Sequence, residues 1–161
     1  MAGIALFAGI GCTVSYSLGG GSVPAAAKTL SVASLTPRAP LCPPQSALAI
    51  TEALRDLMQA QTPLNLTPQD GDIAYEGAIT GYDVQPVAIQ ANETAALNRL
   101  TITVGIHYTN KADSKADADF TVSRFADYAS TQDLANVEAA LVDDIAKQLA
   151  QDIFDRTLGN W

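Results

Sequence analysis

The chain has 161 residues, of which 48% are hydrophobic, 6% aromatic and 16% charged, and its formal net charge is −8. This length suits one domain with its own hydrophobic core, which needs neither a metal nor a disulfide framework. Seventeen acidic side chains against nine basic ones would be repelled by a phosphate backbone, so we expect no nucleic-acid partner.

An apolar run over residues 4–11 comes directly before Cys12. It is far shorter than the about 20 residues that span a bilayer, so it fits a cleaved export signal. A small residue followed by Cys ends the signal peptide of bacterial lipoproteins, so we expect residues 1–11 to be removed and Cys12 to be lipidated. Gly9 replaces the usual Leu and no basic residue precedes the run, which indicates a start further upstream. The alternative is that Cys12 is an ordinary buried cysteine.

Residues 12–27 are predicted to form a flexible tether, because the glycines and alanines there have little to bury. The folded body is then expected to be a single domain over residues 28–161. Its first strand is predicted over residues 28–35, where Leu30 and Val32 alternate with smaller or polar residues. A stiff connector that neither pairs in a sheet nor continues as helix is predicted next from four prolines, Pro37, Pro40, Pro43 and Pro44.

An amphipathic helix is predicted over residues 46–61, because apolar side chains recur there at spacings of three and four. Pro63 ends the helix, and a turn at residues 70–72 leads into a strand over residues 73–84. Glycines inside that strand, Gly77 and Gly81, indicate a bulge or bend.

The cleanest strand pattern covers residues 99–109, where large apolar residues alternate with polar and β-branched ones. A polar turn follows, and a second strand is predicted over residues 116–125, so the two strands form an antiparallel hairpin. One face of this hairpin is expected to be polar and uncovered, as antiparallel sheets permit. The side chains predicted to share that face are Arg99, Thr101, Thr103, His107, Thr121 and Ser123.

A long helix is predicted to begin near Ser130, with Asp133 completing a capping box, and to end before Gly159. The element order has no internal repeat and no βαβαβ rhythm. It favours an α+β fold, with a mixed or antiparallel sheet of about four strands and two helices packed on one face.

Catalytic, metal and cofactor sites are not expected from this sequence. The single histidine, His107, lies on a polar strand face, where a solvated or cross-strand role is simpler than catalysis. Residues 19–21 lack the Lys that follows in a phosphate-binding loop. Cys42 is interpreted as a small core contact rather than a redox group. Solvated charge is the simpler interpretation of three acidic pairs, Asp70/Asp72, Asp117/Asp119 and Asp143/Asp144.

The polar segment from Asn92 to Arg99 precedes the best strand and is a candidate functional loop. Asn92 and Glu93 either contact a partner or cap a local turn. Arg99 either binds an anionic group such as a lipid phosphate or pairs with a carboxylate.

Several segments together resemble a known family. Besides Cys12, they are Thr51–Asp56, Glu76–Tyr82, Pro86–Gln90, Asn92–Val104, Ser123–Tyr128, Gln151–Phe154 and Asn160–Trp161. They resemble the LptE family, the outer-membrane lipoproteins of lipopolysaccharide assembly.

The resemblance implies a helix-on-sheet fold that plugs an LptD-type β-barrel, assists its assembly and helps deliver lipopolysaccharide to the cell surface. It also implies a periplasm-facing location in the outer membrane, with acyl chains on Cys12 as the anchor. The polar strand face would then meet the polar interior of a barrel, whereas the acidic balance disfavours direct contact with an anionic glycolipid. A free-standing periplasmic lipid- or glycan-binding lipoprotein of the same fold is the alternative. The residues expected to contact the partner or lipopolysaccharide are Asn92, Glu93, Arg99, Thr101, Thr103 and His107.

Overall fold

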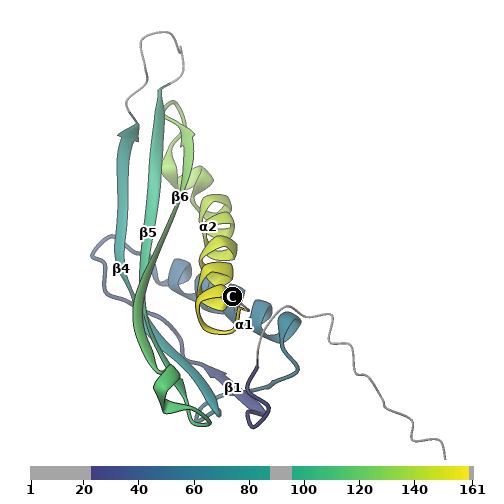
Figure 1. Cartoon of the computed structure of the whole chain (residues 1–161). Coiled ribbons are helices and arrows are strands. Elements are labelled where there is room, and N and C mark those ends of the chain that lie inside the picture. Colours follow the sequence, from purple (N-terminus) through teal and green to yellow (C-terminus); the bar gives the residue numbers. More distant parts are fainter. Residues whose placement is uncertain (1–22, 88–95, 160–161) are drawn as a thin grey trace, which may run out of the picture.

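A computed structural model describes residues 23–87 and 96–159 of the chain. In chain order the elements are β1 (Thr29–Val32), β2 (Thr36–Pro37), α1 (Pro44–Gln61), β3 (Asn65–Thr67), β4 (Ile73–Val87), β5 (Leu97–Asn110), the 3₁₀ turn η1 (Ser114–Ala116), β6 (Ala118–Ala129) and α2 (Leu134–Thr157). Three long strands dominate this arrangement, with the two helices beside them (Figure 1).

The described strands form one six-stranded sheet in the order β3-β1-β4-β5-β6, with β2 pairing separately along β4. β1 runs parallel to β3 and to β4, whereas β4, β5 and β6 are antiparallel. The predicted α+β fold with a mixed sheet is therefore confirmed. The expected count of about four strands was too low, because β2 and β3 have only two and three residues. Segments that short show no alternation of apolar and polar residues, and they are strands only because they pair with neighbouring strands.

Two prolines behave differently from the prediction. Pro37 belongs to β2 and lies opposite Ile79 of β4, which is tolerated because a proline at a sheet edge loses no ladder hydrogen bond on its free side. Pro44 is the first residue of α1, so the helix begins earlier than residue 46. Proline suits this position because its fixed φ matches the helix and the first N–H would be unpaired anyway.

The hairpin strands are longer than predicted, since β4 continues to Val87 and β6 to Ala129. β5 pairs with β4 on one side and with β6 on the other over most of its length. The register between β4 and β5 shifts between Ile79 and Gly81, which confirms the bulge predicted from the glycines. The bulge lets one strand bend within an otherwise regular pair.

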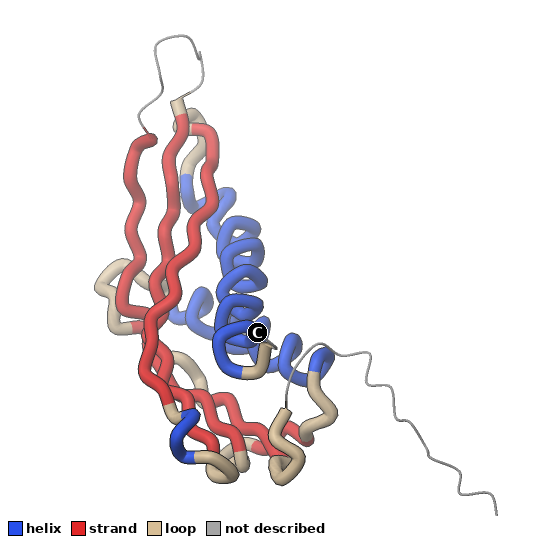
Figure 2. The backbone as a smooth tube through the Cα atoms, in the orientation of Figure 1, coloured by secondary structure: helices blue, strands red, loops and turns tan. Residues whose placement is uncertain are grey.

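Both α-helices lie on one side of the sheet (Figure 2). α1 contacts β1, β2 and β3, α2 contacts β5 and β6, and the helices contact each other. α2 begins after Asp133, whose carboxylate accepts a hydrogen bond from the backbone N–H of Ala135. The predicted start at Ser130 is wrong, because the backbone bond from Ser130 N–H to Ala96 O still belongs to the sheet end. Neither described α-helix is sufficiently long and apolar to cross a bilayer.

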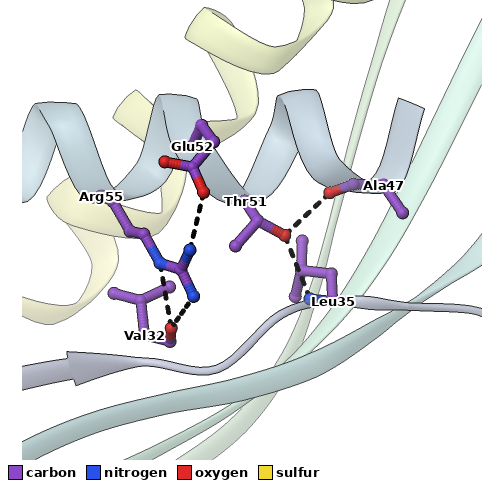
Figure 3. A network of polar contacts seen from close by, with 6 residues as sticks. All are labelled: Val32, Leu35, Ala47, Thr51, Glu52 and Arg55. Atoms are coloured by element: carbon purple, nitrogen blue, oxygen red, sulfur yellow. Dashed lines mark hydrogen bonds and ion pairs between the residues drawn. The ribbon is translucent and has the colours of Figure 1, made fainter. Parts of the chain in front are cut away.

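α1 is attached to the β1–β2 segment by polar contacts as well as by its apolar stripe (Figure 3). The hydroxyl of Thr51 donates to Ala47 O at 2.7 Å and accepts from the backbone N–H of Leu35 at 3.0 Å. The guanidinium of Arg55 donates to Val32 O at 2.7 Å. These bonds pair the backbone N–H of Leu35, between β1 and β2, and the carbonyl of Val32 at the end of β1.

Candidate functional site

The candidate site is the side of the β4–β5–β6 sheet that faces away from the helices, called here the open face. Along β5, Leu100, Ile102 and Val104 are fully buried, and the alternate side chains point to the opposite side of the sheet. The structure thus brings four predicted residues together on this face: Arg99, Thr101, Thr103 and His107.

Strand register assigns each of these residues a neighbour on β4 and on β6. Arg99 lies between Gln85 and Asp127, and His107 lies between Glu76 and Asp119. The same register places Thr101 between Asp83 and Phe125, and Thr103 between Gly81 and Ser123. The open face is therefore a ladder of polar cross-strand groups, the arrangement that stabilises an antiparallel sheet through side-chain pairs.

Arg99 pairs with a carboxylate, one of the two roles proposed for it. Its Nε and Nη2 donate to the two carboxylate oxygens of Asp127 at 2.7 and 2.8 Å, and its guanidinium carbon lies 3.6 Å from the centre of the Phe125 ring. This hydrogen bond raises the pKa of Arg99 and lowers that of Asp127. An anionic ligand at Arg99 would have to compete with a bidentate partner that is already in place.

His107 also has a cross-strand partner. Its Nδ1 lies 2.6 Å from Oδ1 of Asp119, and the side chains are 50% and 82% exposed. The hydrogen bond to Asp119, followed by the charge of that carboxylate, raises the pKa of His107 above its ordinary value. This geometry agrees with the predicted cross-strand role.

The two threonines differ in how they use their hydroxyls. Thr103 Oγ1 lies 3.0 Å from Ser123 Oγ, so these groups bond to each other across β5 and β6. Thr101 lies beside the exposed ring of Phe125, which is 47% accessible. A hydrogen-bonding surface with one aromatic group suits contact with a polar macromolecule better than with hydrocarbon.

The open face is hollowed next to β2. A depression of about 620 Å³ is lined there mainly by β4, β5, β6 and the segment between β1 and β2. Gly105 and Ala78 face each other in this region, and the charged groups around them are Arg38, Glu76, His107 and Asp119.

Three predicted site residues, Cys12, Asn92 and Glu93, lie outside the described residues. Cys42 is buried in the hydrophobic core and has a free thiol, in agreement with its interpretation as a core contact. Burial raises the pKa of that thiol, which makes the reactive thiolate scarcer.

Three members of the acidic pairs, Asp72, Asp117 and Asp143, take part in local hydrogen bonds or ion pairs. Asp72 accepts three hydrogen bonds from Lys28 and Thr29, which lower its pKa. Asp117 accepts from the backbone N–H of Asn110, and Asp143 pairs with Lys147. Among the described residues, no group of three His, Cys, Asp or Glu side chains could hold a metal ion.

Sequence reasoning missed the partners of the predicted residues, above all Asp127, Phe125 and Glu76, and it missed Gly105. The signal for the first two was the β5–β6 hairpin itself, because one correct register pairs Arg99 with Asp127 and Thr101 with Phe125 at once. Turn composition alone did not specify that register, which depends on the connection between the strands.

Two of the solved structures similar to this chain share its fold, and a third is similar at a lower TM-score. Rare lipoprotein B from Shewanella oneidensis is 13% identical, with 76% of this chain and 89% of that chain covered and a TM-score of 0.50. Protein XCC0632 from Xanthomonas campestris is 11% identical, with coverages of 85% and 89% and a TM-score of 0.53. A minor lipoprotein from Acinetobacter baumannii is 18% identical, with coverages of 82% and 96% and a TM-score of 0.48. Comparison with curated proteins gave no match.

The described residues form an α+β domain with one helix-covered sheet face and one polar face that no described helix covers. The family model described as "LptE: Lipopolysaccharide-assembly" matches residues 27–157. The chain therefore belongs to the LptE family, which links it to lipopolysaccharide assembly.

Proposed function

We propose that this protein is an outer-membrane lipoprotein whose domain occupies the lumen of an LptD-type β-barrel and assists the assembly of that barrel. In this role it takes part in delivering lipopolysaccharide to the cell surface. The family match supports the process, and one structural observation supports the mode of action: the open face is polar and is covered by no described helix.

A barrel lumen favours such a surface. The interior of an outer-membrane barrel is polar, so a plug that buries its surface there needs hydrogen-bonding groups to replace those lost to water. The open face supplies hydroxyls, amides and paired charges in rows. Its own cross-strand bonds keep these groups ordered before binding, which lowers the entropy cost of docking.

The anchor in this proposal is Cys12, exposed as the first mature residue after removal of residues 1–11. One acyl chain gives only marginal membrane binding, whereas several chains hold firmly. The tether predicted over residues 12–27 reaches no further than residue 22, because Val23 packs against the core and Ala27 is part of it. It then keeps the domain near the barrel at a high effective concentration. Cys12→Ala is expected to release the exported protein from membranes. Mass spectrometry showing unprocessed, unmodified Cys12 in the native host would contradict the anchor.

The proposed role is non-enzymatic. Its support is the family assignment together with the pairing of His107 with Asp119 on an exposed strand face. Activity of an envelope hydrolase that is lost in His107→Ala would argue for catalysis instead.

The decisive experiment is affinity purification from gently solubilised outer membrane. Wild-type protein is expected to recover a large β-barrel, and Thr103→Leu and Arg99→Glu are expected to reduce that recovery more than they reduce folding stability. Gln59→Leu is the matched control, because Gln59 is exposed on α1 and the change adds similar apolar area away from the open face. Equal loss of recovery and stability would mean that the face is only structural.

The second candidate function is that of a free-standing periplasmic lipid- or glycan-binding lipoprotein. The depression of about 620 Å³ on the open face favours it, because a binding protein needs a concave site. The net charge of −8 and the engagement of Arg99 by Asp127 weigh against an anionic lipid headgroup. Recovery of no barrel, with soluble ligand binding intact, would favour this candidate.

A further inference from the structure

Gly105 lies in the middle of β5 without an internal reason to be glycine. None of the described glycines has a positive φ, so backbone conformation does not require it. A Cβ placed on Gly105 would have one neighbour within 4 Å, the methyl group of Thr80 at 3.8 Å. Glycine in a strand interior weakens the strand by roughly 0.5–1 kcal/mol relative to Ala, so the fold itself would accept a larger residue.

Other glycines of the chain differ clearly from Gly105. A Cβ on Gly77 would lie 2.3 Å from Gly105 O, and one on Gly71 would lie 2.5 Å from Ser31 N. Close internal packing therefore explains these two glycines. At Gly105 the space lies on the outside of the domain, where it forms part of the depression. A strand glycine of this kind commonly marks close approach of another backbone.

The walls of the depression indicate what could fill it. Arg38 brings positive charge, Glu76 and Asp119 bring negative charge, and His107 brings a ring nitrogen that is hydrogen-bonded to Asp119. Any charged occupant would face groups of its own sign, so an uncharged polar occupant fits best. Hydroxyl groups on the rim, among them Thr36 and Thr121, can both donate and accept hydrogen bonds.

We propose that the depression over Gly105 receives a loop of the β-barrel partner, with uncharged polar residues, whose backbone lies close against β5. This inference rests on the proposed function and deepens it by naming where the barrel wall touches the domain. A peptide backbone carries both a donor and an acceptor at each non-proline residue, which matches the mixed donors and acceptors of the walls. Because residue 105 has no side chain, the backbone of the loop can lie close to β5.

The test adds a side chain at position 105, so that it occupies part of the depression. Gly105→Val is expected to keep or raise the melting temperature, because valine favours strands, and to reduce barrel recovery by about tenfold or more, a loss of about 1.4 kcal/mol of binding free energy. Gly105→Ala is expected to show a smaller loss. Gln59→Leu on α1 is again the control, because Gln59 is exposed away from the open face, and its barrel recovery should stay unchanged.

A second variant tests the same proposal in case Gly105→Val does not fold. Thr121 is an exposed residue of β6 that lines the depression. Thr121→Leu should narrow the depression and reduce recovery of the barrel while the domain stays folded. A photo-reactive residue at position 121 should cross-link to the barrel polypeptide, and cross-linking only to glycolipid would overturn the proposal. Normal barrel recovery by a folded Gly105→Val or Thr121→Leu variant would overturn this inference alone. Failure of the wild-type protein to recover any barrel would overturn the proposed function as well.

Discussion

Polar residues of this domain act mainly through the neighbour that the fold places beside them. The guanidinium of Arg99 pairs with Asp127 and stacks on the ring of Phe125. The hydroxyl of Thr103 hydrogen-bonds to that of Ser123. These bonds orient the open face before any partner arrives. On the other side of the sheet, Thr51 bonds backbone groups inside the core, so two similar threonines have very different energetic roles.

Thr51→Val keeps the shape of the side chain but removes its hydroxyl. The backbone N–H of Leu35, which Thr51 Oγ1 accepts at 3.0 Å in a fully buried setting, would then lose its partner. Leaving a buried donor unpaired costs about 1–3 kcal/mol, and denaturant unfolding should show a loss of that size. Thr101→Val on the open face is the control and should change stability by less than about 0.5 kcal/mol. Equal effects would contradict the assigned role of Thr51.

The pKa of His107 should depend on its partner, Asp119. Since the folded pKa is raised above the unfolded value, this pair contributes stability below the unfolded pKa of about 6.5 and loses it as pH rises through the folded pKa. His107 is the only histidine, so its ring signal in an NMR titration needs no further assignment. Asp119→Asn should lower the measured pKa, and an unchanged value would rule out the pair.

At the scale of elements, α2 connects the other helix to the long strands. Its buried residues include Ile145, Leu149 and Ile153, all with no exposed surface. On its rim, Arg124 of β6 donates to both carboxylate oxygens of Asp152. Because these groups are partly exposed, the ion pair contributes little, and apolar packing holds the helix on the sheet.

A matched pair of leucines tests this statement. Leu149→Ala removes a fully buried side chain and should destabilise the domain by about 2–5 kcal/mol, through lost transfer energy and the cavity left behind. Leu48→Ala removes a side chain of α1 that is 57% exposed, and it should change stability by about 0.5 kcal/mol or less. Chemical denaturation of both variants measures the difference, and similar losses would show that α2 is not packed as described.

At the scale of the whole molecule, one hydrophobic cluster joins both helices to the sheet. It includes Leu30 from β1, Ile50 from α1, Ile79 from β4, Val122 from β6 and Ile145 from α2. No second, separate core is present in the described part of the chain. The open face adds polar surface on the outside of this single core, so changes there should affect docking before they affect folding.

Unfolding should therefore be cooperative. Far-UV circular dichroism follows helix and strand, and near-UV circular dichroism follows the buried tyrosines Tyr75, Tyr82, Tyr108 and Tyr128. We expect both signals to give the same midpoint in urea. Shared burial is the physical reason, because neither helix can lose its contacts while the sheet keeps its core. Two separated midpoints would show that the helix layer and the sheet unfold independently.

The sequence predicted the long elements and the short strand β1, but it missed the two shortest strands, β2 and β3. α1, α2, β4, β5 and β6 each carry enough turns or alternations for a period to be visible. β2 and β3 carry none, and Pro37 even argued against β2. The predicted members of the open face were correctly grouped, because side-chain alternation is a local property. Their partners were missed, because a partner depends on register between strands.

By itself the sequence determined the secondary structure of the long segments, the α+β class and the polar character of one face of β5, since each follows from the periodicity of neighbouring residues. Only the tertiary structure decided that Arg99 binds Asp127, that the parallel strands β1 to β3 complete the sheet, and that Gly105 lies under an open depression. The physical reason is the sequence distance involved. Periodicity is a property of a few neighbouring residues, whereas side-chain pairs and surface depressions form where segments distant in the sequence come together.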